Sequence, residues 1–368
     1  MNLAIAKDQI IHGLQAVQNV VSTRTTLPIL SNVLLRAEEN MLELTATDLD
    51  VTVSCSVEAA VKKVGSTTVP VKKVYSLISA LTNPEIEFEV DDKNACSIRA
   101  GSSFYKINGL AAEEFPPIQK FKENKKITLP QEKLKSMLKK TSFAISTDES
   151  RYVLNGIFIS LKDHKMTMVA TDGRRLALVD EEVELGDTTG EFIVPTKAVN
   201  ELSRLLSDKG EVEIKFTENQ VAFALKNEKG ASILIISKLV EGNYPNYRQV
   251  IPAETKERIP LVREEFLAAL KRAEIMTSDK ANSVKLHFTK NNLAITANSP
   301  EVGEARESIA VNYKGKEFAI AFNPAYMIDP LNALSCDEVY LELIDELSPG
   351  VLKTNAPFLY VVMPMRLS

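Results

Sequence analysis

Ala46-Thr47-Asp48 returns as Ala170-Thr171-Asp172, 124 residues further along the chain. Val69-Pro70 returns in the same way as Val194-Pro195, at an offset of 125 residues. A third, weaker copy of the first motif reads Thr296-Ala297-Asn298. The offset is much longer than the roughly 20–50 residues of solenoid repeats, and it has the length of a domain. The sequence therefore predicts one module present in three copies.

The flanking sequence supports the same division. Leu30 to Leu35 is echoed by Leu154 to Ile159, and more faintly by Ala281 to Leu286. Two joints that contain prolines, Phe115 to Ile118 and Asn243 to Pro252, separate the copies. We place the boundaries near residues 126 and 253, which gives modules 1–126, 127–253 and 254–368.

Each copy shows the same order of local patterns. Apolar residues at helical spacing predict an opening helix, and period-two alternation around a polar turn then predicts a hairpin. A second helix starts after a proline, and short strands close the copy. The predicted buried faces of the opening helices are Ile10, Ile11, Leu14, Val17 and Val21; Leu134, Met137, Leu138 and Thr141; and Phe266, Leu267, Leu270 and Ala273. The second helices follow Pro70, Pro195 and Pro324, and Pro330 should kink or shorten the last of them.

The composition is that of an ordinary globular protein, with 45% hydrophobic and 25% charged residues. No apolar run is long enough to cross a membrane, and the first residues do not have the pattern of a signal peptide. Cys55, Cys96 and Cys336 are odd in number and far apart, which favours the reducing cytoplasm. The net charge of −5 argues at first against a nucleic-acid partner. A basic stripe on an acidic body nevertheless remains compatible with it.

Patterns typical of enzymes are weak. His12, His164 and His287 are scattered, and no cysteine pair or glycine-rich phosphate loop occurs. Ser136 and Lys139 match the Ser-x-x-Lys pattern of acyl-serine enzymes, but the companion motifs are absent. Asp48 and Asp50 are compatible with a metal site, although a turn at a strand end is the simpler interpretation. We therefore predict no catalytic residue, no metal and no cofactor.

Lysines gather on the predicted helices of all three copies. One interpretation is that they solvate the exposed side of each helix. The other is a shared cationic surface that contacts phosphates without reading the sequence. The residues concerned are Lys133, Lys135, Lys139 and Lys140; Lys72, Lys73, Lys197 and Arg204; and Lys271 and Arg272.

Two further segments allow more than one interpretation. Tyr360 to Ser368 is apolar almost to its end, which is typical of a buried strand. Met363 and Met365 are alternatively suited to line a groove for partner peptides. Thr171 to Leu176 is either a plain turn with exposed arginines or an adaptable corner beside apolar residues.

Taken together, the motifs resemble the bacterial DNA polymerase III β subunit family, the sliding clamps. The segments that carry the resemblance lie in all three copies: Thr25 to Leu30, Ala46 to Asp50, Arg151 to Gly156, Ala170 to Leu176, Asn243 to Pro245, and Val361 to Leu367. The resemblance implies an α+β chain of three clamp domains, each with two helices packed on antiparallel sheets. Two chains would close head to tail into a ring, with the helices facing duplex DNA. Such a ring performs no chemistry.

The resemblance also implies partners. They are the DNA polymerase III α subunit, the clamp loader, and other DNA polymerases and repair proteins that dock through short peptide motifs. The implied peptide groove comprises Leu154, Thr171, Gly173, Arg175, Leu176, Pro245, Val250, Asn323, Tyr326, Val361, Val362, Met363, Pro364 and Met365. Adding the helix lysines, the predicted DNA-contacting residues are Arg24, Lys72, Lys73, Lys135, Lys139, Arg151, Tyr152 and Lys197. The implied dimer interface comprises Lys73, Phe104, Ile275, Met276, Glu301 and Glu304.

Three positions depart from the family pattern. Arg174 stands where relatives usually carry histidine, Pro330 lies inside a helix, and Ser368 extends the terminus. Two other functions stay open at this point: a triplicated peptide-binding scaffold that does not encircle DNA, and an acyl-serine hydrolase built on Ser136 and Lys139.

Overall fold

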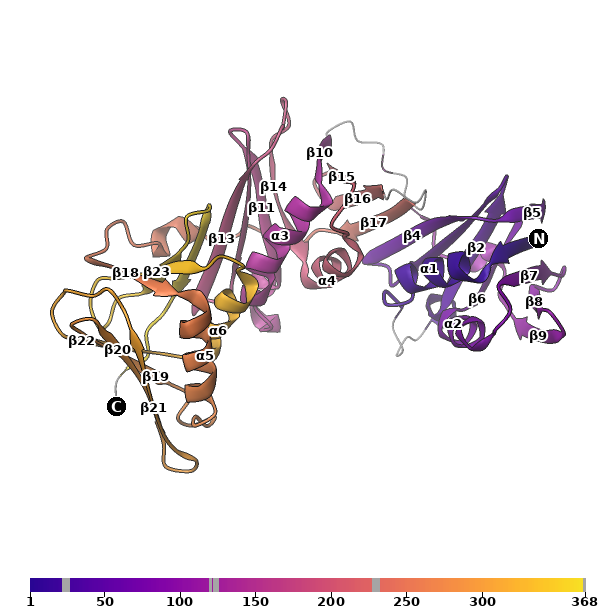
Figure 1. Cartoon of the computed structure of the whole chain (residues 1–368). Coiled ribbons are helices and arrows are strands. Elements are labelled where there is room, and N and C mark those ends of the chain that lie inside the picture. Colours follow the sequence, from indigo (N-terminus) through magenta and orange to yellow (C-terminus); the bar gives the residue numbers. More distant parts are fainter. Residues whose placement is uncertain (22–26, 119–120, 122–125, 227–231, 367–368) are drawn as a thin grey trace. The chain divides into compact units, whose positions relative to one another are not determined.

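The chain forms two compact units. The computed structural model describes residues 1–21, 27–118, 121, 126–226 and 232–366 (Figure 1). One unit comprises Met1–Lys135 and Lys197–Leu239, and the other comprises Ser136–Thr196 and Val240–Ser368. The middle module contributes to both units, because its strands pair into the sheets of its two neighbours along the chain.

The first unit contains two antiparallel sheets and three helices. The order of strands is β5-β1-β7-β8-β9 in one sheet and β10-β15-β16-β17-β4-β3-β2-β6 in the other. Helix α1 packs on α2, β3 and β4. The elements are β1 (Asn2–Ala6), α1 (Lys7–Val17), β2 (Asn32–Glu38), β3 (Met41–Thr47), β4 (Val51–Glu58), β5 (Ala60–Lys63), β6 (Gly65–Pro70), α2 (Val71–Ala80), β7 (Glu85–Val90), β8 (Ala95–Ala100), β9 (Ser103–Asn108), β10 (Lys126–Pro130), α4 (Thr196–Leu205), β15 (Glu211–Phe216), β16 (Gln220–Lys226) and β17 (Ser232–Lys238).

The second unit has the corresponding architecture. Its sheet orders are β14-β11-β12-β13-β25-β24-β23-β18 and β21-β20-β19-β22. Helix α3 (Gln131–Thr141) begins in the first unit and ends in the second. The other elements are β11 (Gly156–Lys162), β12 (Lys165–Thr171), β13 (Arg175–Glu182), β14 (Gly190–Pro195), β18 (Glu257–Val262), α5 (Arg263–Glu274), β19 (Val284–Thr289), β20 (Asn292–Ser299), β21 (Gly303–Ala310), β22 (Phe318–Phe322), α6 (Pro324–Ala333), β23 (Glu338–Leu343), β24 (Gly350–Lys353) and β25 (Phe358–Val362).

The predicted order of elements within each copy is confirmed. Each copy has a strand, an opening helix, a hairpin, a second helix and a closing set of strands. The hairpins share one register, since Glu38 faces Met41, Lys162 faces Lys165 and Thr289 faces Asn292.

The alignment of the third motif was wrong by one residue. In the shared hairpin register, Ala297 corresponds to Ala46 and Ala170, and Thr296 corresponds to Thr45. A slip of one residue exchanges the two faces of a strand. Thr296 therefore faces away from the core, while Ala297 is buried.

The opening helices bury most of their predicted apolar faces, although Ile11 is only half-buried and Val21 lies beyond the end of α1. Ile10, Leu14 and Val17 of α1 are inaccessible to solvent, as are Phe266 and Leu270 of α5. Full burial of one such side chain contributes about 1.5–3 kcal/mol. The corresponding residues of α3 (Leu134, Met137, Leu138 and Thr141) are also buried. Hydrophobic burial under the helices therefore stabilises each copy in the same way.

Pro330 was expected to kink or shorten its helix, and the helix is not shortened. Helix α6 has 10 residues, as do α2 and α4. A proline inside a helix leaves the carbonyl four residues earlier without its helical donor, and here that carbonyl belongs to Tyr326. The buried Tyr360 hydroxyl donates to the Tyr326 carbonyl at 2.6 Å. A side chain of β25 therefore replaces the missing helical hydrogen bond.

This arrangement predicts that Tyr360→Phe destabilises the protein by about 1–3 kcal/mol, because the half-buried Tyr326 carbonyl loses its donor. Pro330→Ala restores a main-chain N–H at the same carbonyl. In that background we expect Tyr360→Phe to cost much less. Urea unfolding of the four variants in a double-mutant cycle measures the difference. Equal costs in both backgrounds would contradict this account.

Candidate functional site

The repeated Thr-Asp motif forms the same turn in the first two modules. The Asp48 carboxylate accepts from the N–H groups of Asp50 and Val51 at 3.1 and 2.8 Å. The Asp172 carboxylate accepts from the N–H groups of Arg174 and Arg175 at 2.9 and 3.1 Å. The residue after each aspartate has a positive φ of 80° or 86°, and it is leucine in the first turn and glycine in the second. The motif therefore recurs because it forms the tight turn that follows a strand.

The carboxylates of the first turn are held by lysines. Asp48 forms an ion pair with Lys197, and Asp50 forms one with Lys238 at 2.9 Å. Among the described residues, no group of acidic, histidine or cysteine side chains is arranged to hold a metal ion. The turn interpretation of Asp48 and Asp50 therefore accounts for both residues.

The second turn carries a network centred on Arg175. Its guanidinium donates to Asp172 at 3.1 Å, to Asp329 at 2.6 Å and to the Phe143 carbonyl at 2.7 Å. The same group lies 4.4 Å from the centre of the Tyr326 ring. Only 11% of the Arg175 side chain is exposed. Arg175 therefore ties the end of β12 and the start of β13 to helix α6, with its charge neutralised by two carboxylates.

The predicted groove residues lie around this network, all in the second unit. Four of them are buried: Leu154, Leu176, Val361 and Val362. Leu176 and Val361 face each other across β13 and β25 and form an apolar floor, whereas the Val362 side chain points to the opposite face of β25. Val250, Met363 and Met365 are exposed by 50%, 45% and 37%. The remaining predicted residues are exposed or half-buried: Thr171, Gly173, Arg175, Pro245, Asn323, Tyr326 and Pro364. Asn323 has a structural role as well, because its side chain caps α6 by accepting from the Ala325 N–H at 3.0 Å.

An apolar cluster beside this surface contains the predicted Leu176 and Val361 together with three residues that the sequence analysis did not name, Phe158, Val169 and Ile193. Phe158, Val169, Leu176, Ile193 and Val361 pack together, and Tyr244 stacks on Phe158 at 5.0 Å between ring centres. Burial raises the pKa of the Tyr244 hydroxyl. Strand β11 is buried on both faces from Gly156 to Leu161, so alternation alone did not single out Phe158, and it gave no sign that the joint after the second module covers this residue.

Three residues at equivalent places on the outer sheet face differ in chemistry from module to module. Strand pairing sets three residues side by side on the sheet face away from the helices, which we call the outer-face triad. The triads are Leu34, Thr45 and Thr68; Phe158, Val169 and Ile193; and Lys285, Thr296 and Ala321. The first is mixed, the second apolar and the third polar.

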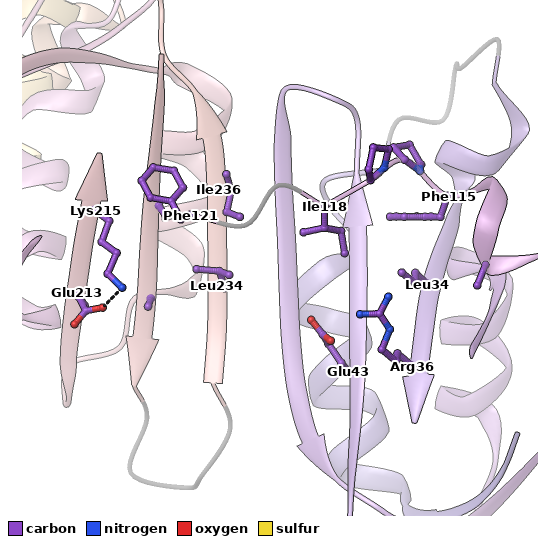
Figure 2. Close-up of a pocket in the computed structure, with 15 residues that line it drawn as sticks. Leu34, Arg36, Glu43, Phe115, Ile118, Phe121, Glu213, Lys215, Leu234 and Ile236 are labelled. Atoms are coloured by element: carbon purple, nitrogen blue, oxygen red, sulfur yellow. Dashed lines mark ion pairs between the residues drawn. The ribbon is translucent and has the colours of Figure 1, made fainter. Parts of the chain in front are cut away.

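The first triad lies beside a cavity in the first unit. The cavity has a volume of about 680 Å³ and is lined by Leu34, Phe115, Ile118, Leu234 and Ile236 (Figure 2). Charged residues also line it, among them Glu213 and Lys215, which form an ion pair at 3.0 Å. Thr45 is satisfied by Ser54 at 2.8 Å, and Thr68 by Asn32 at 2.9 Å. This surface is consequently less apolar than its counterpart in the second module.

The predicted DNA-contacting residues differ in whether their side chains form ion pairs within the chain. Lys72, Lys73 and Lys139 are exposed, without an ion-pair partner among the described residues. Lys135 is paired with Asp208 at 2.7 Å, and Lys197 with Asp48. Arg24 lies outside the described residues.

The loop of Arg151 and Tyr152 is held by Asp148. Arg151 donates to the Asp148 carboxylate at 3.0 Å, and Tyr152 is 58% exposed. Hydrogen bonds from Ser150, and then from Arg151, hold the pKa of the Asp148 carboxyl below its usual value. A Cβ atom on Gly173 would lie 2.6 Å from the Arg151 guanidinium, so the loop packs closely against the second turn.

The predicted dimer residues lie at two sheet edges. Phe104 is 56% exposed on β9, an outermost strand of its sheet. Ile275 is 69% exposed just after α5, and Met276 lies near Gly303 at the start of the edge strand β21. Lys73, Glu301 and Glu304 are exposed, and Glu301 pairs with Lys280 at 2.9 Å.

The described residues do not support the hydrolase hypothesis. Ser136 and Lys139 lie on α3 without a hydrogen bond between their side chains. The pKa values of the Cys55 and Cys96 thiols are raised to about 12 by burial, which keeps both thiols protonated. Within the part of the chain that the structure describes, no helix is long and apolar enough to cross a membrane.

Comparison with known proteins gives consistent matches along the chain. Three family models match in order: the DNA polymerase III beta subunit N-terminal domain over residues 1–119, its central domain over 128–246 and its C-terminal domain over 248–366. The beta sliding clamp of Chlamydia pneumoniae is 36% identical over 100% of this chain and 99% of its own length.

Solved structures agree with these matches. A DnaN sliding clamp from Bartonella birtlesii, bound to griselimycin, has a TM-score of 0.94 and 36% identity over 100% of both chains. The DNA polymerase sliding clamp of Bacillus subtilis has a TM-score of 0.94 and 30% identity over the same coverage.

The Arg175 network predicts that Arg175→Lys destabilises the protein by about 2–4 kcal/mol, because one ammonium group cannot replace three guanidinium contacts. Arg174→Lys is the matched control, since the neighbouring Arg174 is exposed. We expect the control to change stability by less than about 0.5 kcal/mol. Urea unfolding measures both variants, and equal effects would refute the role given to Arg175.

Proposed function

The chain belongs to the DNA polymerase III beta subunit family, the sliding clamps, and we propose that two copies of it close head to tail into a ring around duplex DNA. A ring of this kind tethers a polymerase to its template by enclosing the DNA, and it needs no sequence readout. The alternative of a scaffold that does not encircle DNA is not favoured, because the relatives named above are DNA sliding clamps over their full lengths.

The observation that carries the proposal is the pairing of sheet edges. Within the chain, β17 pairs with β4 and β25 pairs with β13. By their order in the repeat, β9 corresponds to β17 and β25, and β21 corresponds to β4 and β13. Among the described strands, β9 and β21 are therefore the two members of this set that have a neighbour on one side only. Unpaired strand edges present N–H and C=O groups that another strand can satisfy.

A contact between two different edges is heterologous, and such contacts form a ring when the rotation closes. The three modules of one chain already contain two of these junctions. The third would join β9 of one copy to β21 of the next. The proposal of two copies per ring comes from the family resemblance.

The side chains near these edges suit such a junction. Phe104 on β9 and Ile275 beside β21 are both large, apolar and exposed. Lys73 is exposed on α2 and Glu304 is exposed on β21, so opposite charges are available to flank the proposed junction. Burial of the apolar pair supplies the stability, and the charges favour one orientation.

For DNA, we propose that the helix lysines face the duplex. Lys72, Lys73 and Lys139 have exposed ammonium groups. The exposed Arg151 and Tyr152 loop supplies further contacts, and we retain Arg24, Lys135 and Lys197 as proposed contacts. A cationic helix surface on a chain of net charge −5 requires the acidic groups to lie elsewhere. Such contacts weaken as the salt concentration rises.

For protein partners, we propose that the surface around Met363 and Met365 binds short peptides. Exposed methionines over a buried apolar floor suit several different ligands. The proposed partners are the DNA polymerase III α subunit, the clamp loader, and other polymerases and repair proteins. We propose that the protein acts in the cytoplasm with the chromosome, and that it has no catalytic activity of its own.

Replacing both Met363 and Met365 by alanine should weaken binding of a labelled peptide from the clamp-binding segment of the polymerase α subunit by roughly tenfold or more, since apolar contact area is lost. Leu347→Ala is the control, because Leu347 is 77% exposed elsewhere in the same unit. Fluorescence anisotropy measures the affinities. Unchanged affinity of the methionine variant would refute the peptide surface.

Replacing Ile275 and Met276 by aspartate should give monomers, because an unpaired charge is costly to bury in an interface. Val262→Asp is the control, since Val262 is 52% exposed just before α5. Analytical ultracentrifugation measures the mass. A dimer in the Ile275 and Met276 variant would contradict the proposed closure.

A further inference from the structure

The outer-face triad of the third module opens into a polar pocket. The pocket has a volume of about 500 Å³, and Lys285, Thr296 and Ala321 of the triad all line it. Lys280, Glu301 and Arg366 line it as well. In the second module the same three positions are the apolar Phe158, Val169 and Ile193. One backbone arrangement therefore carries opposite chemistry in two adjacent modules.

The pocket has an excess of positive charge. Lys280, Lys285 and Arg366 supply three cations, and all three side chains are exposed. Glu301 is the one acidic residue among those that line the pocket, and it pairs with Lys280 at 2.9 Å. Lys285 and Arg366 have no ion pair with any described residue. Within the described residues, an anionic ligand would therefore find two cations that have no ion-pair partner.

The pocket lies on the sheet face away from helix α5. Val284 and Leu286 are inaccessible to solvent, and α5 packs against β19, β20 and β21. Lys285 stands between them in the strand, so its side chain points to the opposite face. Helix α5, which carries Lys271 and Arg272, lies on the other side of this sheet, so the pocket does not share a face with these helix cations and its location favours a protein ligand over the enclosed duplex.

The pocket begins where the proposed peptide surface ends. The Met363 N–H donates to the Arg174 carbonyl at 2.9 Å, and the Met365 N–H donates to the Ala321 carbonyl at 2.7 Å. Ala321 belongs to the triad, and Arg366 follows directly and lines the pocket. The segment Met363 to Arg366 thus runs from the apolar surface into the cationic pocket.

We propose that this pocket binds acidic side chains of a partner protein whose apolar peptide occupies the surface around Met363 and Met365. The inference rests on the proposed peptide surface and adds a second, electrostatic contact to it. Exposed ion pairs contribute little individually. Two such ion pairs would together tighten binding of the acidic partner by about two- to tenfold at low salt. The pocket would therefore distinguish among partners that share the apolar contact.

The test uses the labelled polymerase peptide in three forms: unextended, extended by a short run of aspartates, and extended by the same number of serines. Each extension is placed at either end in turn. We expect the aspartate form to bind the protein about two- to tenfold more tightly than the serine form at about 50 mM salt, and equally at about 500 mM. Replacing Lys280 and Lys285 by serine removes one uncompensated cation and frees Glu301 to oppose Arg366 in the same pocket, so it should abolish the gain and leave the unextended peptide unaffected.

Lys290→Ser is the matched control, because Lys290 is an exposed lysine in the turn after β19 and does not line the pocket. It should keep the full gain. Lys285→Glu should instead favour a peptide extended by lysines. Equal binding of the aspartate and serine forms, or a gain that survives in the double variant, overturns the inference. If the unextended peptide itself fails to bind, the proposed peptide surface is wrong and this inference falls with it.

Discussion

Main-chain pairing between strands of successive modules is the interaction on which the rest of the structure depends. Strand β4 pairs with β17, and β13 pairs with β25, so each long sheet contains strands of two modules. The pairing satisfies backbone groups that would otherwise lie at an open edge. It also explains why the middle module is divided between the two compact units. The same pairing leaves β9, the counterpart of β17 and β25, and β21, the counterpart of β4 and β13, at sheet edges, and ring closure would repeat a contact that the chain already makes twice.

Within this repeated framework, side-chain chemistry has diverged at corresponding positions. The outer-face triad combines leucine with two threonines in the first module, is apolar in the second and contains Lys285 in the third. Burial follows the same difference, since Phe158 is covered by Tyr244 while Lys285 is exposed. The backbone of the module is therefore reused, while the small set of residues that faces outward differs in chemistry from copy to copy.

The sequence predicted those features that depend on local patterns. The three copies, their helices and their hairpins follow from periodicities that any one copy contains. What it could not predict depends on contacts between distant residues. Tyr360, on strand β25, supplies the hydrogen bond that Pro330 cannot make in helix α6. The Arg175 guanidinium donates to Asp329, which lies 154 residues further along the chain. The alignment of Thr296 with the earlier motif failed for a related reason, because strand register, and not residue similarity, fixes the face that each side chain occupies.

The candidate site likewise contains residues that the sequence predicted and residues that it did not. The motifs indicated Met363, Met365 and the second turn through the resemblance, but not the Phe158 cluster that the joint containing Tyr244 covers. Charge counts suggested a cationic helix surface, yet Lys197 is paired with Asp48 and Lys135 with Asp208. Such pairings depend on the folded positions of side chains far apart in the chain.

Retention on DNA of different topology tests the central claim most directly. The protein is placed on nicked circular DNA with a clamp loader and ATP, and the DNA is then separated from free protein by gel filtration before and after linearisation. The account predicts that the protein stays with the circle and is lost from the linear form, because enclosure and not affinity holds it. Equal retention on both forms, or no retention on the circle, would contradict it.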